Sequence, residues 1–152
     1  MVISSKGANQ FEIKTKFSTI AAGERVTVNS TQLAGPGEYE VGDCKVTGFP
    51  PSIYRIEAEE LTIVYLDGIK EKPSDAMIEE LSEPDALFIP VGGGIGSEDA
   101  EKLIKLIDPK VVIPIGSDDD LAKLGGTLQP TKQLKLTKQT LPETGRVMYQ
   151  FT

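Results

Sequence analysis

The sequence predicts a single globular domain of the mixed α/β or α+β class. Of its 152 residues, 39% are hydrophobic and 26% are charged, an ordinary balance for a folded domain of this length. Strand-like segments fill the first half, helix-like segments alternate with apolar strands in the middle, and strand-like segments return at the end. Because no linker or repeat divides the chain, we expect residues 1–152 to form one domain with helices packed on sheet.

The first half alternates apolar and polar residues, a pattern typical of strands with one buried face. Phe11 and Ile13 alternate with charged residues, and Val26 and Val28 flank a threonine. Further strands are expected around Val41, Cys44 and Val46, and in a hairpin formed by Ile53–Glu57 and Leu61–Leu66.

Two helices are predicted next, over Ser74–Leu81 and Ser97–Ile107. In the second, apolar residues recur at three- and four-residue intervals, which places them on one helix face, and Ser97 is the expected N-cap. The continuous apolar runs Ala86–Val91 and Val111–Ile115 predict strands covered on both faces. The last strands are expected at Leu134–Thr137 and Val147–Phe151.

The most restrictive feature of the composition is that the chain has no histidine and one cysteine, Cys44. This excludes Ser-His-Asp and Cys-His catalytic groups, and zinc sites that need imidazole or several thiolates. A bound metal would have to be a hard cation such as Mg²⁺ or Ca²⁺, held by carboxylates and carbonyls. The absence of an internal disulfide and of a secretory signal favours a cytoplasmic protein. The net charge of −7 and the lack of a long apolar segment argue against nucleic acid or a membrane as partner.

The segment Gly92–Gly96 lies between a predicted strand and a predicted helix, where a glycine-rich loop can hold a phosphate. Its spacing matches neither the dinucleotide-binding motif nor the P-loop, and Glu98 and Asp99 place negative charge where a phosphate would lie. A tight backbone turn is therefore the expected role. Asp118–Asp120 is the densest carboxylate cluster, and a solvated loop or helix start is favoured there over a weak Ca²⁺ site.

Nucleophile candidates are weak. Ser5 and Ser117 have no evident base to activate their hydroxyls, although Lys6 could in principle serve a Ser-Lys pair. Cys44 lies within a strand pattern, which favours a small packed thiol over a reactive one.

Several segments together resemble one family, the small prokaryotic zinc-dependent hydrolases of the metallo-β-lactamase fold. They are Gly35–Gly42 (GPGEYEVG), Val46–Pro50 (VTGFP), Asp85–Gly94 (DALFIPVGGG) and Pro109–Pro114 (PKVVIP), and Ile3–Phe11 is similar to the opening strand and loop of that family. The resemblance covers nearly the whole chain. It implies an αββα sandwich with a metal centre at one edge, between the two sheets.

The metal ligands that the resemblance implies are missing or displaced. Ala8 follows Gly7 where the family has a histidine, the His-x-His-x-Asp-His loop before Gly35 is absent, and Gly116 stands where the last histidine belongs. The order of the Leu-Gly-Asp motif is exchanged to Leu-Asp67-Gly68. We therefore expect a truncated sandwich with no metal, no cofactor and no catalytic residue. The degenerate edge would consist of Gly7, Ala8, Asp67, Gly68, Gly92, Gly93, Gly94, Gly116 and Ser117.

The favoured function is a non-catalytic, metal-free protein that acts in interaction or assembly, as a homodimer or with another protein. Loss of the ligand loop is expected to uncover apolar surface near Phe11, Phe17 and Val26–Leu33, which a symmetric dimer could cover. One alternative is a small-ligand or nucleotide-binding module that uses the Gly92–Gly96 edge. The other is a residual hydrolase that uses Asp67 and Asp118–Asp120 with Mg²⁺ or Mn²⁺.

Overall fold

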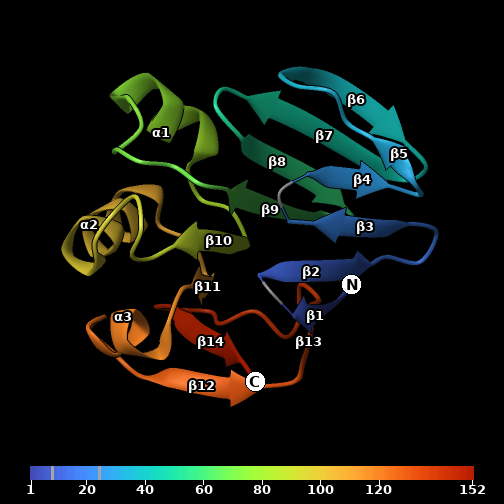
Figure 1. Ribbon diagram of the computed structural model, residues 1–152. Coiled ribbons are helices and arrows are strands. Elements are labelled where there is room, and N and C mark those ends of the chain that lie inside the picture. The colour runs from blue at the N-terminus through green and yellow to red at the C-terminus, as the bar shows by residue number, and fades with distance from the viewer. Residues whose placement is uncertain (8, 24) are drawn as a thin grey trace.

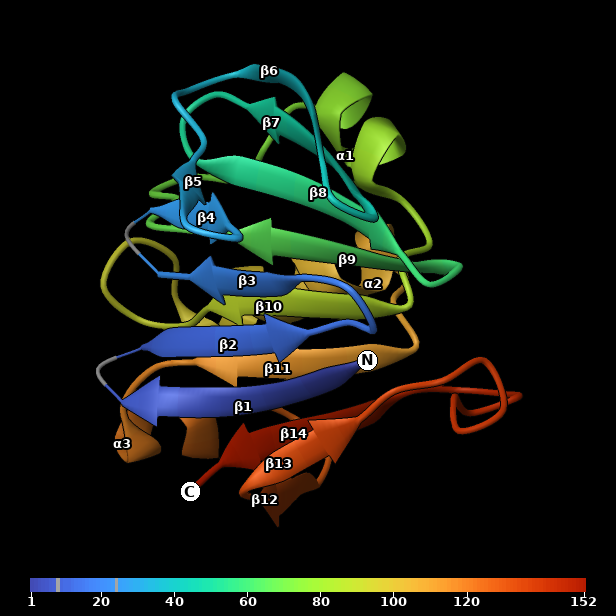
Figure 2. The same ribbon diagram turned by 90° about the vertical axis from the view of Figure 1, so that its right-hand side faces the viewer.

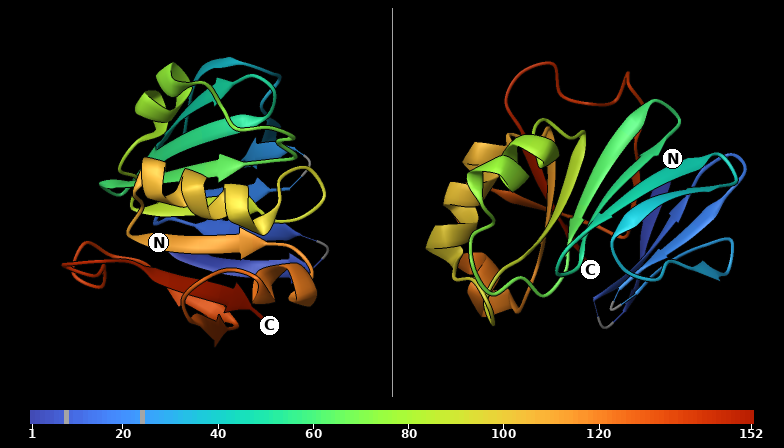
Figure 3. Two further views of the ribbon diagram at one scale, coloured as in Figure 1. Left: turned by 90° about the vertical axis from the view of Figure 1, so that its left-hand side faces the viewer. Right: turned by 90° about the horizontal axis from the view of Figure 1, so that it is seen from above.

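Two β-sheets stack face to face in the computed structural model, and helices cover the outer face of one of them (Figure 1). The structure describes residues 1–7, 9–23 and 25–152. Seen from above, the layers follow the order helices, larger sheet, smaller sheet (Figure 3). No helix of the described part of the chain covers the outer face of the smaller sheet, so the expected αββα sandwich is reduced to three layers.

The smaller sheet is antiparallel and has the strand order β13-β1-β2-β3-β4-β5 (Figure 2). Strands β2 and β4 were predicted by their alternation, and β1 by the resemblance. The short strands β3 and β5 were not predicted, because pairing with their neighbours rather than a local pattern makes them strands. The bounds are β1 (Val2–Gly7), β2 (Gln10–Lys14), β3 (Thr19–Ala22), β4 (Val26–Val28), β5 (Thr31–Gln32) and β13 (Gln133–Lys135).

The larger sheet is mixed and has the order β12-β14-β11-β10-β9-β8-β7-β6. Strands β6 to β9 are antiparallel, whereas β9, β10, β11, β14 and β12 run parallel to one another. The predicted hairpin is confirmed, with Glu59 and Glu60 at positive φ in its turn. The bounds are β6 (Gly37–Val41), β7 (Cys44–Phe49), β8 (Ile53–Ala58), β9 (Leu61–Leu66), β10 (Ala86–Pro90), β11 (Val111–Ile115), β12 (Leu128–Thr131) and β14 (Val147–Phe151).

The helices are α1 (Asp75–Leu81), α2 (Ser97–Ile107) and α3 (Asp118–Ala122). The hydroxyl of Ser74 caps α1 by accepting a hydrogen bond from the amide of Met77 at 3.2 Å. The N-cap of α2 is Gly96 and not Ser97, because the serine already has helical geometry; Gly96 offers no side-chain cap. No helix among the described residues is long and apolar enough to span a bilayer.

The core has two layers, one on each face of the larger sheet. Along β9, Ile63 and Tyr65 pack between the sheets, whereas Val64 and Leu66 pack beneath the helices. This alternation follows from the two-residue period of a strand. As predicted, β10 and β11 are buried on both faces.

The expected apolar surface on the smaller sheet is not there. Phe11, Val26, Val28 and Leu33 are at most 6% exposed, and of the apolar residues named for that surface only Phe17 is open, at 70%. The shortened connections let the two sheets close over these side chains, which join the core between them. The surface that motivated a homodimer is therefore inside the monomer.

Candidate functional site

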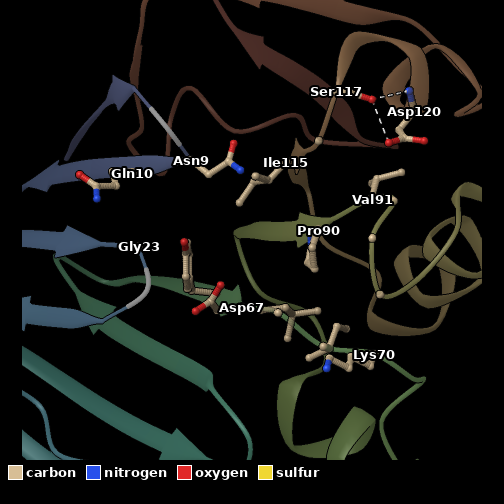
Figure 4. A pocket seen from close by; sticks show the side chains of 18 residues that line it. Asn9, Gln10, Gly23, Asp67, Lys70, Pro90, Val91, Ile115, Ser117 and Asp120 are labelled. Atoms are coloured by element: carbon tan, nitrogen blue, oxygen red, sulfur yellow. Dashed lines mark hydrogen bonds between the residues drawn. The ribbon is translucent and has the colours of Figure 1, made fainter.

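A cleft of about 990 Å³ lies at one end of the sandwich, where three parallel strands end together (Figure 4). Strands β9, β10 and β11 end at Leu66, Pro90 and Ile115, and the segments that follow them form much of the wall. The carboxyl ends of parallel strands are the usual place for a ligand in such sheets. The cleft is lined by Asn9, Gln10, Gly23, Tyr65–Lys70, Pro90–Gly94, Ile115–Ser117 and Asp120.

Close backbone contacts and positive φ angles explain why glycine occupies these positions in the cleft. A Cβ at Gly94 would collide with the carbonyl oxygen of Ile69, and a Cβ at Gly116 would collide with that of Val91. Gly92 and Gly93 have φ of +87° and +67°, a region that disfavours other residues. The Gly92 amide donates to the Ile95 carbonyl at 2.7 Å, which closes a tight turn. The geometry supports the turn interpretation over a phosphate cradle.

Asp120 is the member of the acidic cluster Asp118–Asp120 that lines the cleft. Its carboxylate lies so close to Gly92 that a Cβ there would collide with it. The Ser117 hydroxyl donates to this carboxylate at 2.8 Å and accepts from the Asp120 amide at 3.1 Å, which caps the short helix α3. Ser117 thus has a structural role as the N-cap of α3. Of the two roles expected for the acidic cluster, a solvated loop or a helix start, the structure shows a helix start.

Tyr65 lies near the end of β9 and Asp67 directly follows that strand, and both line the cleft. Tyr65 is 2% exposed, and its ring centroid lies 5.3 Å from that of Phe88. Burial, and secondarily the nearby carboxylate of Asp67, raises the pKa of Tyr65 far above its usual value. Its hydroxyl therefore stays protonated. Asp67 is half-buried, and its amide donates to the Ser52 carbonyl at 3.1 Å.

The structure brings together most of the residues that the sequence assigned to one edge. Asp67, Gly68, Gly92–Gly94, Gly116 and Ser117 all line the cleft. Gly7 is not among the lining residues, and Ala8 lies outside the described residues.

Sequence reasoning missed four polar lining residues, Asn9, Gln10, Tyr65 and Lys70. Tyr65 was interpreted only as part of an apolar strand. The available signal was that Tyr65 carries a polar hydroxyl and lies two positions before Asp67, near the end of β9. Asn9, Gln10 and Lys70 carry no such signal, because only the folding of the chain brings their segments to this edge.

The residues present do not fit the zinc that the fold family implies. The chain has no imidazole, and its one thiol, Cys44, packs in the core between the sheets, where burial raises its pKa to about 11. Within residues 1–7, 9–23 and 25–152, no three His, Cys, Asp or Glu side chains are grouped so that they could hold a metal ion. A catalytic zinc needs three protein ligands.

One family profile and one solved structure agree on the fold of this chain. A family profile described as a beta-lactamase superfamily domain matches residues 5–116. A crystal structure from Thermotoga maritima, named as a candidate Zn-dependent hydrolase of the metallo-beta-lactamase superfamily, superposes with a TM-score of 0.83. The two chains share 21% sequence identity over 100% of each, so this likeness shows the fold alone.

The metallo-beta-lactamase fold protein YhfI from Bacillus subtilis is a more distant match. It has a TM-score of 0.48 and 15% identity over 79% of this chain and 51% of that one. Comparison with proteins of curated function gives no match. Since the family profile spans well over half of the sequence, the chain belongs to the beta-lactamase superfamily.

Proposed function

We propose that this chain is a metal-free, non-catalytic member of the beta-lactamase superfamily that acts by binding at its cleft. One observation carries the proposal. The cleft at the end of β9–β11 is open and has polar lining residues, whereas the lining residues that the structure describes include no group of side chains suited to a catalytic metal. A scaffold of this kind carries no activity by itself.

Residual hydrolysis is the competing function, with Asp67 and Asp118–Asp120 on Mg²⁺ or Mn²⁺. Metal-assisted hydrolysis depends on an ion held firmly enough to lower the pKa of a bound water. Here Asp67 and Asp120 line different sides of the cleft (Figure 4), and the Ser117 hydroxyl donates a hydrogen bond to Asp120 at 2.8 Å. Asp118 accepts instead from the Gln150 amide at 2.9 Å. This dispersal favours binding over metal-assisted catalysis.

Elemental analysis of protein purified without a chelator or an affinity tag tests the proposal. We expect well under one equivalent of any transition metal, and no hydrolytic activity that changes in Asp67→Asn or Asp120→Asn. One tightly held equivalent of metal, or an activity that Asp67→Asn abolishes while the matched surface variant Asp119→Asn retains it, would establish the hydrolase instead.

Assembly with a second copy or another protein stays a separate proposal, and so does a cytoplasmic location, which the single unpaired cysteine supports. The remaining support for assembly is the exposed ring of Phe17, since the apolar sheet surface is buried. Multi-angle light scattering over a tenfold dilution series tests it. A constant mass near the 16.4 kDa of one chain would contradict self-association.

A further inference from the structure

We infer that the cleft binds a small molecule bearing an ammonium group, which is held between the Tyr65 hydroxyl and the Asp67 carboxylate. The inference deepens the proposed binding function and rests on it.

The Tyr65 hydroxyl is the observation that points to a ligand. Tyr65 is 2% exposed, yet its hydroxyl makes no hydrogen bond to any described residue. No described side-chain oxygen or nitrogen is both sealed from solvent and without a partner, so this hydroxyl must reach solvent in the cleft that Tyr65 lines. A buried ring that presents one unpaired polar atom to a cleft is unusual, because tyrosine hydroxyls at buried positions normally find a partner.

The position of this hydroxyl is rigidly set. The Tyr65 ring packs against Phe88, whose centroid in turn lies 4.9 Å from that of Phe11 in an edge-on contact. These rings belong to the core between the sheets, so rotation of Tyr65 away from the cleft would open a cavity there. The site therefore requires little reordering when a ligand arrives.

Charge decides which ligand suits the cleft. Its described ionisable side chains, apart from the neutral Tyr65, are Asp67, Asp120 and Lys70. Figure 4 shows Asp67 and Lys70 on the side of the cleft away from Ser117 and Asp120. The exposed Asp118 and Asp119 add negative charge beside the α3 rim, and the chain as a whole carries −7. The excess of negative charge gives a negative electrostatic potential, which attracts cations and repels phosphate or carboxylate ligands.

An ammonium group can contact the Tyr65 hydroxyl and the Asp67 carboxylate together. It can donate to the carboxylate of Asp67 and to a lone pair of the Tyr65 hydroxyl, and charge-assisted hydrogen bonds of this kind are the stronger ones. The amides of Asn9 and Gln10 line the same cleft and suit hydroxyl groups elsewhere on the ligand.

Three probes of equal size and different charge test the inference: glucosamine, glucose and gluconate. Each is titrated into ¹⁵N-labelled protein while amide shifts are followed by NMR. We expect glucosamine to give saturable shifts at Asp67, Gly68 and Gly93, glucose to bind at least fivefold more weakly, and gluconate to give none. Raising the salt concentration should weaken glucosamine binding.

Matched variants separate recognition from folding. Asp67→Asn should weaken glucosamine at least tenfold, whereas Asp119→Asn, which removes the same charge outside the lining, should change the affinity less than twofold. Tyr65→Phe should weaken binding about fivefold and leave the midpoint of thermal unfolding unchanged, because the hydroxyl has no hydrogen-bond partner among the described residues. Tyr54→Phe, on β8 and outside the lining, is its control.

Each other outcome counts against the inference. Equal binding of glucose, preference for gluconate, or no saturable shift with any probe would overturn the ammonium site. A drop in unfolding midpoint for Tyr65→Phe would show that the hydroxyl serves the fold. None of these results would show that the chain binds a metal or hydrolyses a substrate. Failure of the ammonium site therefore remains distinct from failure of the proposed metal-free function, which elemental analysis tests.

Discussion

Substituting Gly94 with alanine should destabilise the protein, because the new methyl group meets backbone and not a movable side chain. A Cβ at this position would collide with the carbonyl oxygen of Ile69 and approach the Cα of Lys70 at 3.0 Å. Both obstacles belong to the main chain that follows β9. Relief requires the Gly92–Gly96 turn and that segment to separate, and overpacking of this kind typically costs about 1–3 kcal/mol.

Two neighbouring glycines isolate the steric effect. A Cβ at Gly93 would meet nothing within 4 Å, but its φ is +67°, so Gly93→Ala should cost about 1 kcal/mol from backbone conformation alone. Gly96 has φ of −78° and open space around it, so Gly96→Ala should lie within about 0.5 kcal/mol of the wild type. We expect Gly94→Ala to be the most destabilised of the three.

Urea unfolding followed by circular dichroism measures the series. For a domain of this size, a loss of 1 kcal/mol lowers the thermal midpoint by about 2–4 °C, which gives an independent check. If Gly94→Ala proved as stable as Gly96→Ala, the close approach of the two segments would be incorrect, and with it the steric account of the glycine run.

Two further predictions concern titratable groups at the turn from β6 to β7. A hydrogen bond from the Ser18 hydroxyl, with a further one from Thr15 at 2.9 Å, holds the pKa of Asp43 below its usual value. The stability from this carboxylate is therefore present above pH 4 and lost as the pH falls through the lowered pKa, so Asp43→Asn should flatten the acid limb of unfolding midpoint against pH; an unchanged limb would contradict the contact. Burial raises the pKa of Cys44 to about 11, so iodoacetamide at pH 8 should label it only after denaturation. Rapid labelling of the native protein would show that the thiol is not packed between the sheets.

Local patterns predicted the elements that have strong local causes. The continuous apolar runs of β10 and β11 and the amphipathic face of α2, with Leu103 and Ile104 buried, could be interpreted without knowledge of partners. The strands β3, β5 and β12 could not, because they are short and are held by pairing in a sheet. β3 and β5 pair with strands next to them in the sequence, and β12 pairs with the more distant β14, but no pattern within one segment encodes this pairing.

The candidate site divides in the same way. Asp67 and Gly92–Gly94 were assigned to one edge because they follow strands, and parallel strands end at one edge. The reason for the glycines at 94 and 116 was not available from the sequence. Each is required by the backbone of a segment that only the fold brings within contact distance.

The sequence by itself determined what chemistry this protein can offer. A chain without histidine and with one cysteine cannot assemble, from its own side chains, a zinc site built on imidazoles or on several thiolates, whatever its fold. Only the tertiary structure decided which apolar side chains are buried in the core and which polar groups face the cleft. Phe11 and Leu33 are buried because the two sheets close over them, and Tyr65 lines the cleft because β9 ends there. Both outcomes depend on how far apart the sheets pack, and that distance is set by the whole core rather than by any segment of the chain.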